Sequence, residues 1–199
     1  VFTFRGDIKP KNYDVVELGM PRNATLERLY KLFFFIDIFK VEKTVKQLED
    51  YDLIISFLYP MTILGATVNR YFKKKFIYYN VGVAYPRLFG SIFERTYMRM
   101  FNFLTNFTVK NASDAISISN FLRKELKRET GLDSKIKYVT VDKKLYNTKL
   151  NKKKVAAIVK KHKLRKPVLL YVGRLSPHKG AHLLLKAFRL VKEKIPEAT

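Results

Sequence analysis

The sequence predicts an α/β fold built from parallel sheets with helices on both faces. Hydrophobic residues make up 47% of the 199 residues, which is typical of a globular chain with a sizeable core. Short apolar segments alternate with longer segments in which apolar residues recur every three or four positions. The short segments indicate strands and the longer ones indicate helices, and their alternation favours parallel strands joined by helical crossovers.

In the first half of the chain, the spacing of Phe34, Ile38 and Val41 predicts one helix over 26–48. Pro60 suits the start of a helix over 61–74, and the lysines at 73–75 suit its end. A long helix follows over about 87–109. Short apolar segments predict strands over 1–4, 14–18, 52–57 and 76–79.

In the second half, Ser119 is placed to cap the N-terminus of a helix over 120–130, and Gly131 is placed to end it. A basic segment is expected to contain a helix over about 151–163. The last helix, over 181–193, follows a short basic loop. Strands are predicted over 114–118, 135–139 and 168–172.

The charge of the chain is strongly positive, at +23, with 40 basic and 17 acidic residues. Residues 143–166 contain eleven basic and no acidic residues, and they form either a solvated surface or a face toward an anionic partner. The chain has no cysteine, which excludes disulfides, zinc–thiolate sites and thiol nucleophiles. No uninterrupted apolar run approaches the roughly 20 residues of a membrane-spanning helix.

The most informative segment is the glycine turn after the strand at 168–172. Gly173 lets the backbone pass close to a ligand, Arg174 carries a planar fork suited to phosphate, and Lys179 carries a mobile positive charge. The helix that starts near Gly180 adds its N-terminal N–H groups. These groups together suit a diphosphate, whereas an ordinary turn with exposed basic residues is an equally good interpretation of the spacing alone.

Residues 172–180 and 183–188 together resemble the start of the C-terminal domain in glycosyltransferase family 4, one of the group 1 glycosyl transferases. Residues 114–121 resemble the late strand and serine-capped helix of that family's N-terminal domain. Residues 141–142 and 145–147 resemble its Gly-Val-Asp and aromatic positions, without the usual Asn-Gly. The resemblance implies a GT-B fold with two Rossmann-like domains, nucleotide-sugar donors and retention of anomeric configuration.

The resemblance also implies roles for particular residues. Arg174 and Lys179 match the residues that bind the donor diphosphate, and Gly173 and Gly180 match the glycines of the turn. Neither a metal nor another cofactor is expected, because the nucleotide-sugar is itself a substrate. The implied organisation is an acceptor-side N-terminal domain over 1–142, a basic linker and helix over 143–166, and the start of a nucleotide-sugar-binding domain over 167–199.

The sequence departs from the family pattern in three features. It lacks the pair of glutamates eight residues apart and the glycine-rich loop after the first strand, so we expect a fragment without either end that is inactive alone. Asn80-Val81-Gly82 stands where the family often has a histidine, so no catalytic residue is assigned. Asn80, Gly82 and Ser119 are assigned to the acceptor cleft.

The resulting hypothesis is a retaining glycosyltransferase of carbohydrate biosynthesis, acting on a sugar, lipid-linked or polysaccharide acceptor. A non-catalytic basic module that binds an anionic membrane or nucleic acid is the alternative, as is a degenerate transferase remnant, although nucleic acid is the less favoured partner. We expect a cytoplasmic location. Peripheral docking on the inner face of the membrane is a further hypothesis, with residues 26–41 either the docking element or a core helix.

Overall fold

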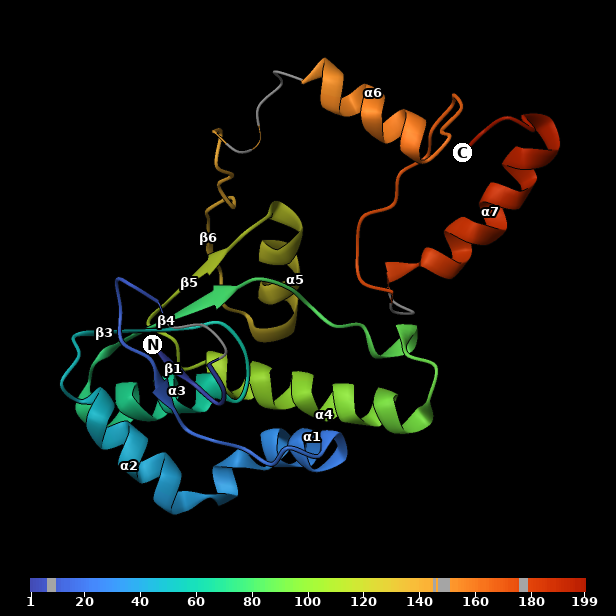
Figure 1. Ribbon diagram of the computed structural model, residues 1–199. Coiled ribbons are helices and arrows are strands. Elements are labelled where there is room, and N and C mark those ends of the chain that lie inside the picture. The colour runs from blue at the N-terminus through green and yellow to red at the C-terminus, as the bar shows by residue number, and fades with distance from the viewer. Residues whose placement is uncertain (7–9, 145, 147–150, 176–178) are drawn as a thin grey trace. The chain divides into compact units, whose positions relative to one another are not determined.

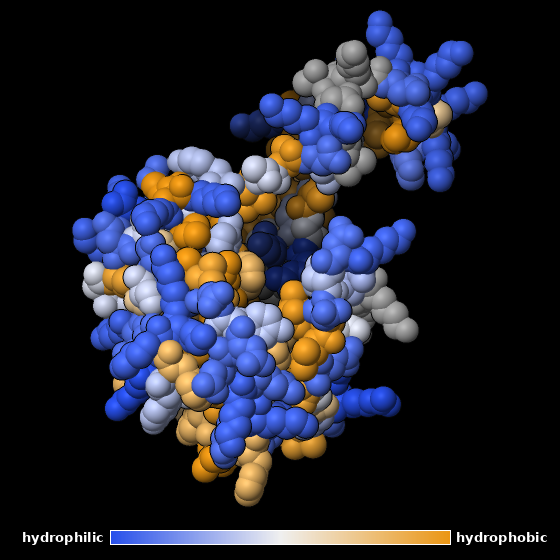
Figure 2. Space-filling view, turned by 90° about the vertical axis from the view of Figure 1, so that its left-hand side faces the viewer, coloured by the Kyte–Doolittle hydropathy of each residue, from blue (hydrophilic) through white to orange (hydrophobic). Residues whose placement is uncertain are grey.

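The computed structural model describes residues 1–6, 10–144, 146, 151–175 and 179–199. They form two compact units, one made of residues 1–86 and 93–139, the other of residues 87–92 and 140–199 (Figure 1). The side of the molecule seen in Figure 2 is mostly hydrophilic, with patches of hydrophobic residues between the polar ones.

The first unit contains two parallel sheets, as the alternating sequence pattern predicts. The larger sheet has the order β3-β4-β5-β6, and every neighbouring pair in it is parallel. The smaller sheet pairs β1 with β2, also in parallel. The strands are β1 Phe2–Thr3, β2 Val16–Glu17, β3 Leu53–Ser56, β4 Lys75–Asn80, β5 Asp114–Ser117 and β6 Lys135–Ile136. The α/β class with parallel sheets is therefore confirmed.

Helices connect these strands and supply the rest of the core. Ser119 caps α5, where its side chain accepts a hydrogen bond from the backbone N–H of Leu122, and the left-handed Gly131 ends that helix, as predicted. The helices of the first unit are α1 Ala24–Leu32, η1 Phe34–Ile36, α2 Ile38–Leu48, α3 Met61–Phe72, α4 Ile92–Val109 and α5 Asn120–Thr130; the 3₁₀ helix η2 Pro86–Leu88 precedes α4.

The single helix expected over 26–48 is wrong, because the chain turns between α1 and α2. Asp37 starts α2 by accepting a hydrogen bond from the N–H of Lys40. The turn carries Phe34 into the core, where it is fully buried and lies edge-on to Phe4 with ring centroids 5.0 Å apart. Burying this ring stabilises the break, although the apolar spacing continues across it.

β4 lies at the centre of the first unit and positions its polar cavity. Phe76, Tyr78 and Asn80 are buried and alternate along the strand, so they share one face of the sheet. Phe76 and Tyr78 pack with Val109 of α4 in one of the two hydrophobic clusters of the described residues. Asn80, the last residue of β4, therefore stands at the carboxyl end of a well-anchored strand.

An apolar groove separates the smaller sheet from β3 within the same unit. Its volume is about 740 Å³, and it is lined by residues 1–4 on one side and 53–61 on the other. Among the described residues, β3 pairs only with β4, so its second edge faces this groove. Leu53 and Ile55 on that edge strand are both about half exposed.

The second unit contains α6 Lys152–Lys161 and α7 Ala181–Lys194. The strand expected over 168–172 is wrong, since no strand forms there. Leu169 N–H donates to the carbonyl of Thr199 at 2.7 Å, and Thr199 N–H donates to the carbonyl of Pro167 at 3.0 Å. These two hydrogen bonds have the pattern of parallel strand pairing, but both involve the single residue Thr199. A strand needs hydrogen bonds to several consecutive residues of a partner strand.

Candidate functional site

The first predicted site lies in the second unit, at the N-terminus of α7. Gly180 caps the helix in the left-handed conformation, with φ +72°, which a glycine adopts at little cost. The Tyr171 hydroxyl donates to the carbonyl of Arg174 at 3.1 Å and closes the turn. A Cβ at Gly173 would lie 2.9 Å from the Tyr171 hydroxyl oxygen, so a larger residue would displace the end of the side chain that closes the turn.

The two predicted cations lie on either side of this turn. Arg174 and Lys179 are both exposed, and neither forms an ion pair within the described part of the chain. Residues 176–178 of the motif lie outside the described residues. Since α7 presents its N-terminal N–H groups next to Lys179, this end of the helix carries a concentration of positive charge suited to an anion.

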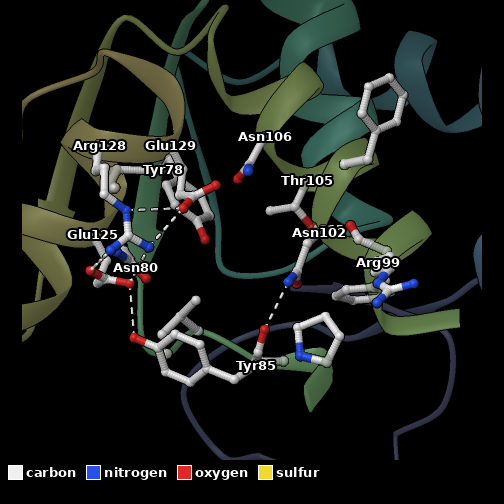
Figure 3. A pocket seen from close by; sticks show the side chains of 17 residues that line it. Tyr78, Asn80, Tyr85, Arg99, Asn102, Thr105, Asn106, Glu125, Arg128 and Glu129 are labelled. Carbon is white, nitrogen blue, oxygen red and sulfur yellow. Dashed lines mark hydrogen bonds and ion pairs between the residues drawn. The ribbon is translucent and has the colours of Figure 1, made fainter. Parts of the chain in front are cut away.

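The second site is a cavity of about 450 Å³ in the first unit, between α4 and α5 (Figure 3). The end of β4 and the loop 82–86 form part of its wall. Asn80 and Gly82, both predicted for the acceptor side, line this cavity. Ser119, predicted with them, does not line it; its hydroxyl oxygen caps α5 instead.

Charged groups along one wall of the cavity form a closed network. Glu125 accepts a hydrogen bond from the Tyr85 hydroxyl at 2.8 Å and pairs with both terminal nitrogens of Arg128, each at 2.8 Å. Arg128 also pairs with Glu129 at 2.8 Å. Each group of the network thus has a partner of opposite charge or a hydrogen bond, which leaves this wall close to neutral.

Polar atoms from β4 and α4 line the opposite wall. Asn102 donates to the carbonyl of Ala84 at 2.7 Å, which ties the loop to α4. Tyr78 lies one alternate position before Asn80 on β4, and burial raises the pKa of its hydroxyl to about 12. Tyr78, Asn102 and the glutamates of α5 belong to no sequence motif, and the only signal in the sequence is the alternation along β4, which places Tyr78 on the face of Asn80.

Within the residues that the structure describes, no three His, Cys, Asp or Glu side chains come together as a metal-binding group. No helix in that same part of the chain has the length and apolar character needed to cross a membrane.

Comparison with known proteins gives one family and several related structures. Residues 152–199 match the family described as Glycosyl transferases group 1. The search of curated proteins found no match. The structure of Anabaena Alr3699/HepE in complex with UDP and glucose is similar at 20% identity and a TM-score of 0.64, covering 94% of this chain and 46% of that chain.

The same Anabaena protein in complex with UDP-glucose is similar at 22% identity and a TM-score of 0.61, covering 80% of this chain and 42% of that chain. In complex with UDP it is similar at 21% identity and a TM-score of 0.58, with coverages of 88% and 43%. The chain thus spans less than half the length of the structures it resembles. The likeness confirms the fold expected from the sequence, a GT-B type of α/β fold with Rossmann-like units.

Proposed function

We propose that this chain is part of a glycosyltransferase that moves a sugar from a nucleoside-diphosphate-sugar to an acceptor. The observation that carries the proposal is the family match over residues 152–199, because it contains Arg174, Lys179 and the N-terminus of α7. Anabaena HepE, whose fold is similar, binds UDP-glucose, a ligand of the proposed donor class. The proposed donor unit begins at residue 167, after the basic linker 143–166 and the acceptor-side unit over 1–142.

The chemistry follows from where negative charge develops. As the bond between the anomeric carbon and the donor phosphate oxygen breaks, its electron pair leaves with the nucleoside diphosphate, while an acceptor hydroxyl oxygen bonds to that carbon and its proton passes to the departing phosphate. The guanidinium group of Arg174 can donate hydrogen bonds to two phosphate oxygens, and the ammonium group of Lys179 adds a positive charge beside them. The N-terminal N–H groups of α7 can donate to the same phosphate groups. Groups of this kind stabilise the departing charge, and removal of one such donor slows enzymes by about 10²–10³.

The reaction proposed here proceeds with retention and draws its charge stabilisation from these side chains rather than from a metal. The acceptor is a sugar carried by a lipid or a polysaccharide. In this proposal the acceptor contacts Asn80 and Gly82, which is supported by their position in the lining of the cavity of the first unit. Ser119 supports that side indirectly, because it fixes the start of α5.

The test uses the protein that carries this chain, with Arg174→Ala and Lys179→Ala. We expect each variant to weaken UDP binding at least tenfold in calorimetry and to lower sugar transfer about 10²-fold or more, with an unchanged circular dichroism spectrum. The control is Lys194→Ala, which removes the same charge at the other end of α7, about 20 Å away. Normal UDP binding by both site variants would refute the assignment.

A second proposal concerns docking on an anionic bilayer, and the turn between α1 and α2 favours it. Ile36, Ile38 and Phe39 project from this turn with exposed fractions of 63%, 66% and 88%. Lysines at 43 and 46 on α2 are exposed nearby in the sequence. Exposed apolar side chains beside lysines suit insertion at the headgroup level of an anionic membrane.

Vesicle flotation tests this docking. We expect binding to vesicles of phosphatidylglycerol but not of phosphatidylcholine, and a loss of binding in Phe39→Ser. The matched control is Phe103→Ser on α4, whose side chain is 67% exposed and lies outside the turn. Equal loss in both variants, or binding that is insensitive to lipid charge, would argue against docking through this turn.

A further inference from the structure

Two buried polar atoms in the cavity of the first unit have no protein partner among the described residues. Tyr78 is only 4% exposed, and its hydroxyl forms no hydrogen bond there. Asn80 is equally buried; its amide nitrogen donates to Ser117 Oγ at 3.4 Å and to the Leu122 carbonyl at 3.1 Å, while its carbonyl oxygen has no donor. Buried polar atoms are nearly always satisfied, so each calls for a partner in the cavity.

Side chains from the two helices face the same space. Figure 3 shows Asn106 of α4 and Glu129 of α5 turned toward the cavity near Tyr78. The side-chain amide of Asn106 also forms no hydrogen bond within the described part of the chain, so it offers both a donor and an acceptor. The cavity therefore presents a hydroxyl, two amide groups and a carboxylate to whatever fills it.

The charges around the cavity balance, which limits the kind of ligand. The cavity lining contains two negative side chains, Glu125 and Glu129, and two positive ones, Arg99 and Arg128. Arg128 is already paired with both glutamates. An anion would meet two carboxylates and a cation would meet two guanidinium groups, so a neutral ligand is favoured.

A sugar ring has the required chemistry. Each of its hydroxyls both donates and accepts, as the Tyr78 hydroxyl, the Asn80 carbonyl and the Asn106 amide demand. The Tyr85 and Phe101 side chains add apolar surface for the C–H groups of a ring. A volume of about 450 Å³ lies within the range of small-molecule pockets.

We propose that the cavity between α4 and α5 binds a neutral sugar ring through Tyr78 Oη, Asn80 Oδ1 and Asn106. The inference rests on the proposed function only for the role of that sugar, which is to be part of the acceptor. The site itself rests on the cavity and on polar atoms that have no partner among the described residues, and it involves neither Arg174 nor Lys179.

Saturation-transfer NMR on the protein that carries this chain tests the proposal. The probes are the methyl glycosides of glucose, galactose, mannose and N-acetylglucosamine, with inorganic phosphate as the anionic probe. We expect at least one glycoside to bind, and Tyr78→Phe and Asn106→Ala each to weaken that binding tenfold or more. Tyr78→Phe removes an oxygen that has no partner among the described residues, so the thermal midpoint of the variant should equal or exceed that of the parent.

The control for Asn106→Ala is Asn111→Ala, which follows the end of α4 and does not line this cavity. A glycoside signal that persists in Tyr78→Phe would overturn the proposal, as would binding of phosphate alone or of no probe, since water would then suffice to fill the cavity. UDP binding is measured in parallel. Tyr78→Phe should retain it, so a failure of the sugar site is distinguished from a failure of the donor site.

Discussion

Replacing Gly65 with alanine tests the packing that holds β4 in place. A Cβ at this position of α3 would lie 2.6 Å from two ring carbons of Phe76, at least 0.8 Å inside ordinary contact at 3.4 Å. Phe76 is fully buried and packs with Tyr78 and Val109, so the ring has no free space to enter. Overpacking of this kind lowers the free energy of unfolding by about 3 kcal/mol at the upper end of the usual range. The higher helix propensity of alanine raises it by about 1 kcal/mol.

The net expectation for Gly65→Ala is a loss of about 2 kcal/mol in the free energy of unfolding, measured by urea unfolding followed by circular dichroism. Gly90→Ala is the control, since among the described residues no atom beyond its two chain neighbours lies within 4 Å of a Cβ at that position. Adding Phe76→Leu to Gly65→Ala should recover part of the loss by making room. A Gly65→Ala variant as stable as the parent would show that α3 does not rest on the ring.

Three further predictions concern caps and titrating groups. Ser119→Ala should lower the free energy of unfolding by about 1 kcal/mol in urea, because the N–H of Leu122 loses its cap. Hydrogen bonds from Arg123 hold the pKa of Asp133 well below its ordinary value of 3.8, so the ionised carboxylate stabilises the fold fully above pH 3.8. This stabilisation is lost as the pH falls below 3.8, so Asp133→Asn should lose less stability than the parent when the protein is titrated with acid. Burial raises the pKa of Tyr78 from 10.0 to about 12, so its neutral form stabilises the fold below pH 10 and this contribution is lost as the pH rises toward 12; Tyr78→Phe should unfold less readily over that range.

Local signals explain what the sequence could predict about the fold. The bounds of α5 agree with expectation because Ser119 and Gly131 act on their own neighbours in the chain. The break between α1 and α2 was missed because Phe34 and Ile38 keep helical spacing across it, and only contact with Phe4 shows why the chain turns. Strand formation at 168–172 depends on partners elsewhere in the chain, which its own composition cannot reveal.

The candidate sites show the same contrast between signals from neighbouring residues and contacts between distant parts of the chain. Arg174 and Lys179 were found because their motif is continuous in sequence. The cavity of the first unit joins β4, a loop, α4 and α5, so no short motif contains it. Asn80 was named because it stood at an expected histidine position, whereas Tyr78 and Asn106 acquire their significance only when packing leaves their polar atoms facing one space.

The open edge of β3 has a consequence for handling the chain in solution. No strand in the part of the chain that the structure describes pairs with this edge, so it can pair with the same edge of another molecule beside the apolar groove. A net charge of +23 opposes such pairing through repulsion, but salt screens that repulsion over about 10 Å at 0.1 M. Preparations of residues 1–199 should therefore stay dispersed in dilute buffer and self-associate as salt is added, the reverse of what is usual for a protein held together by ion pairs.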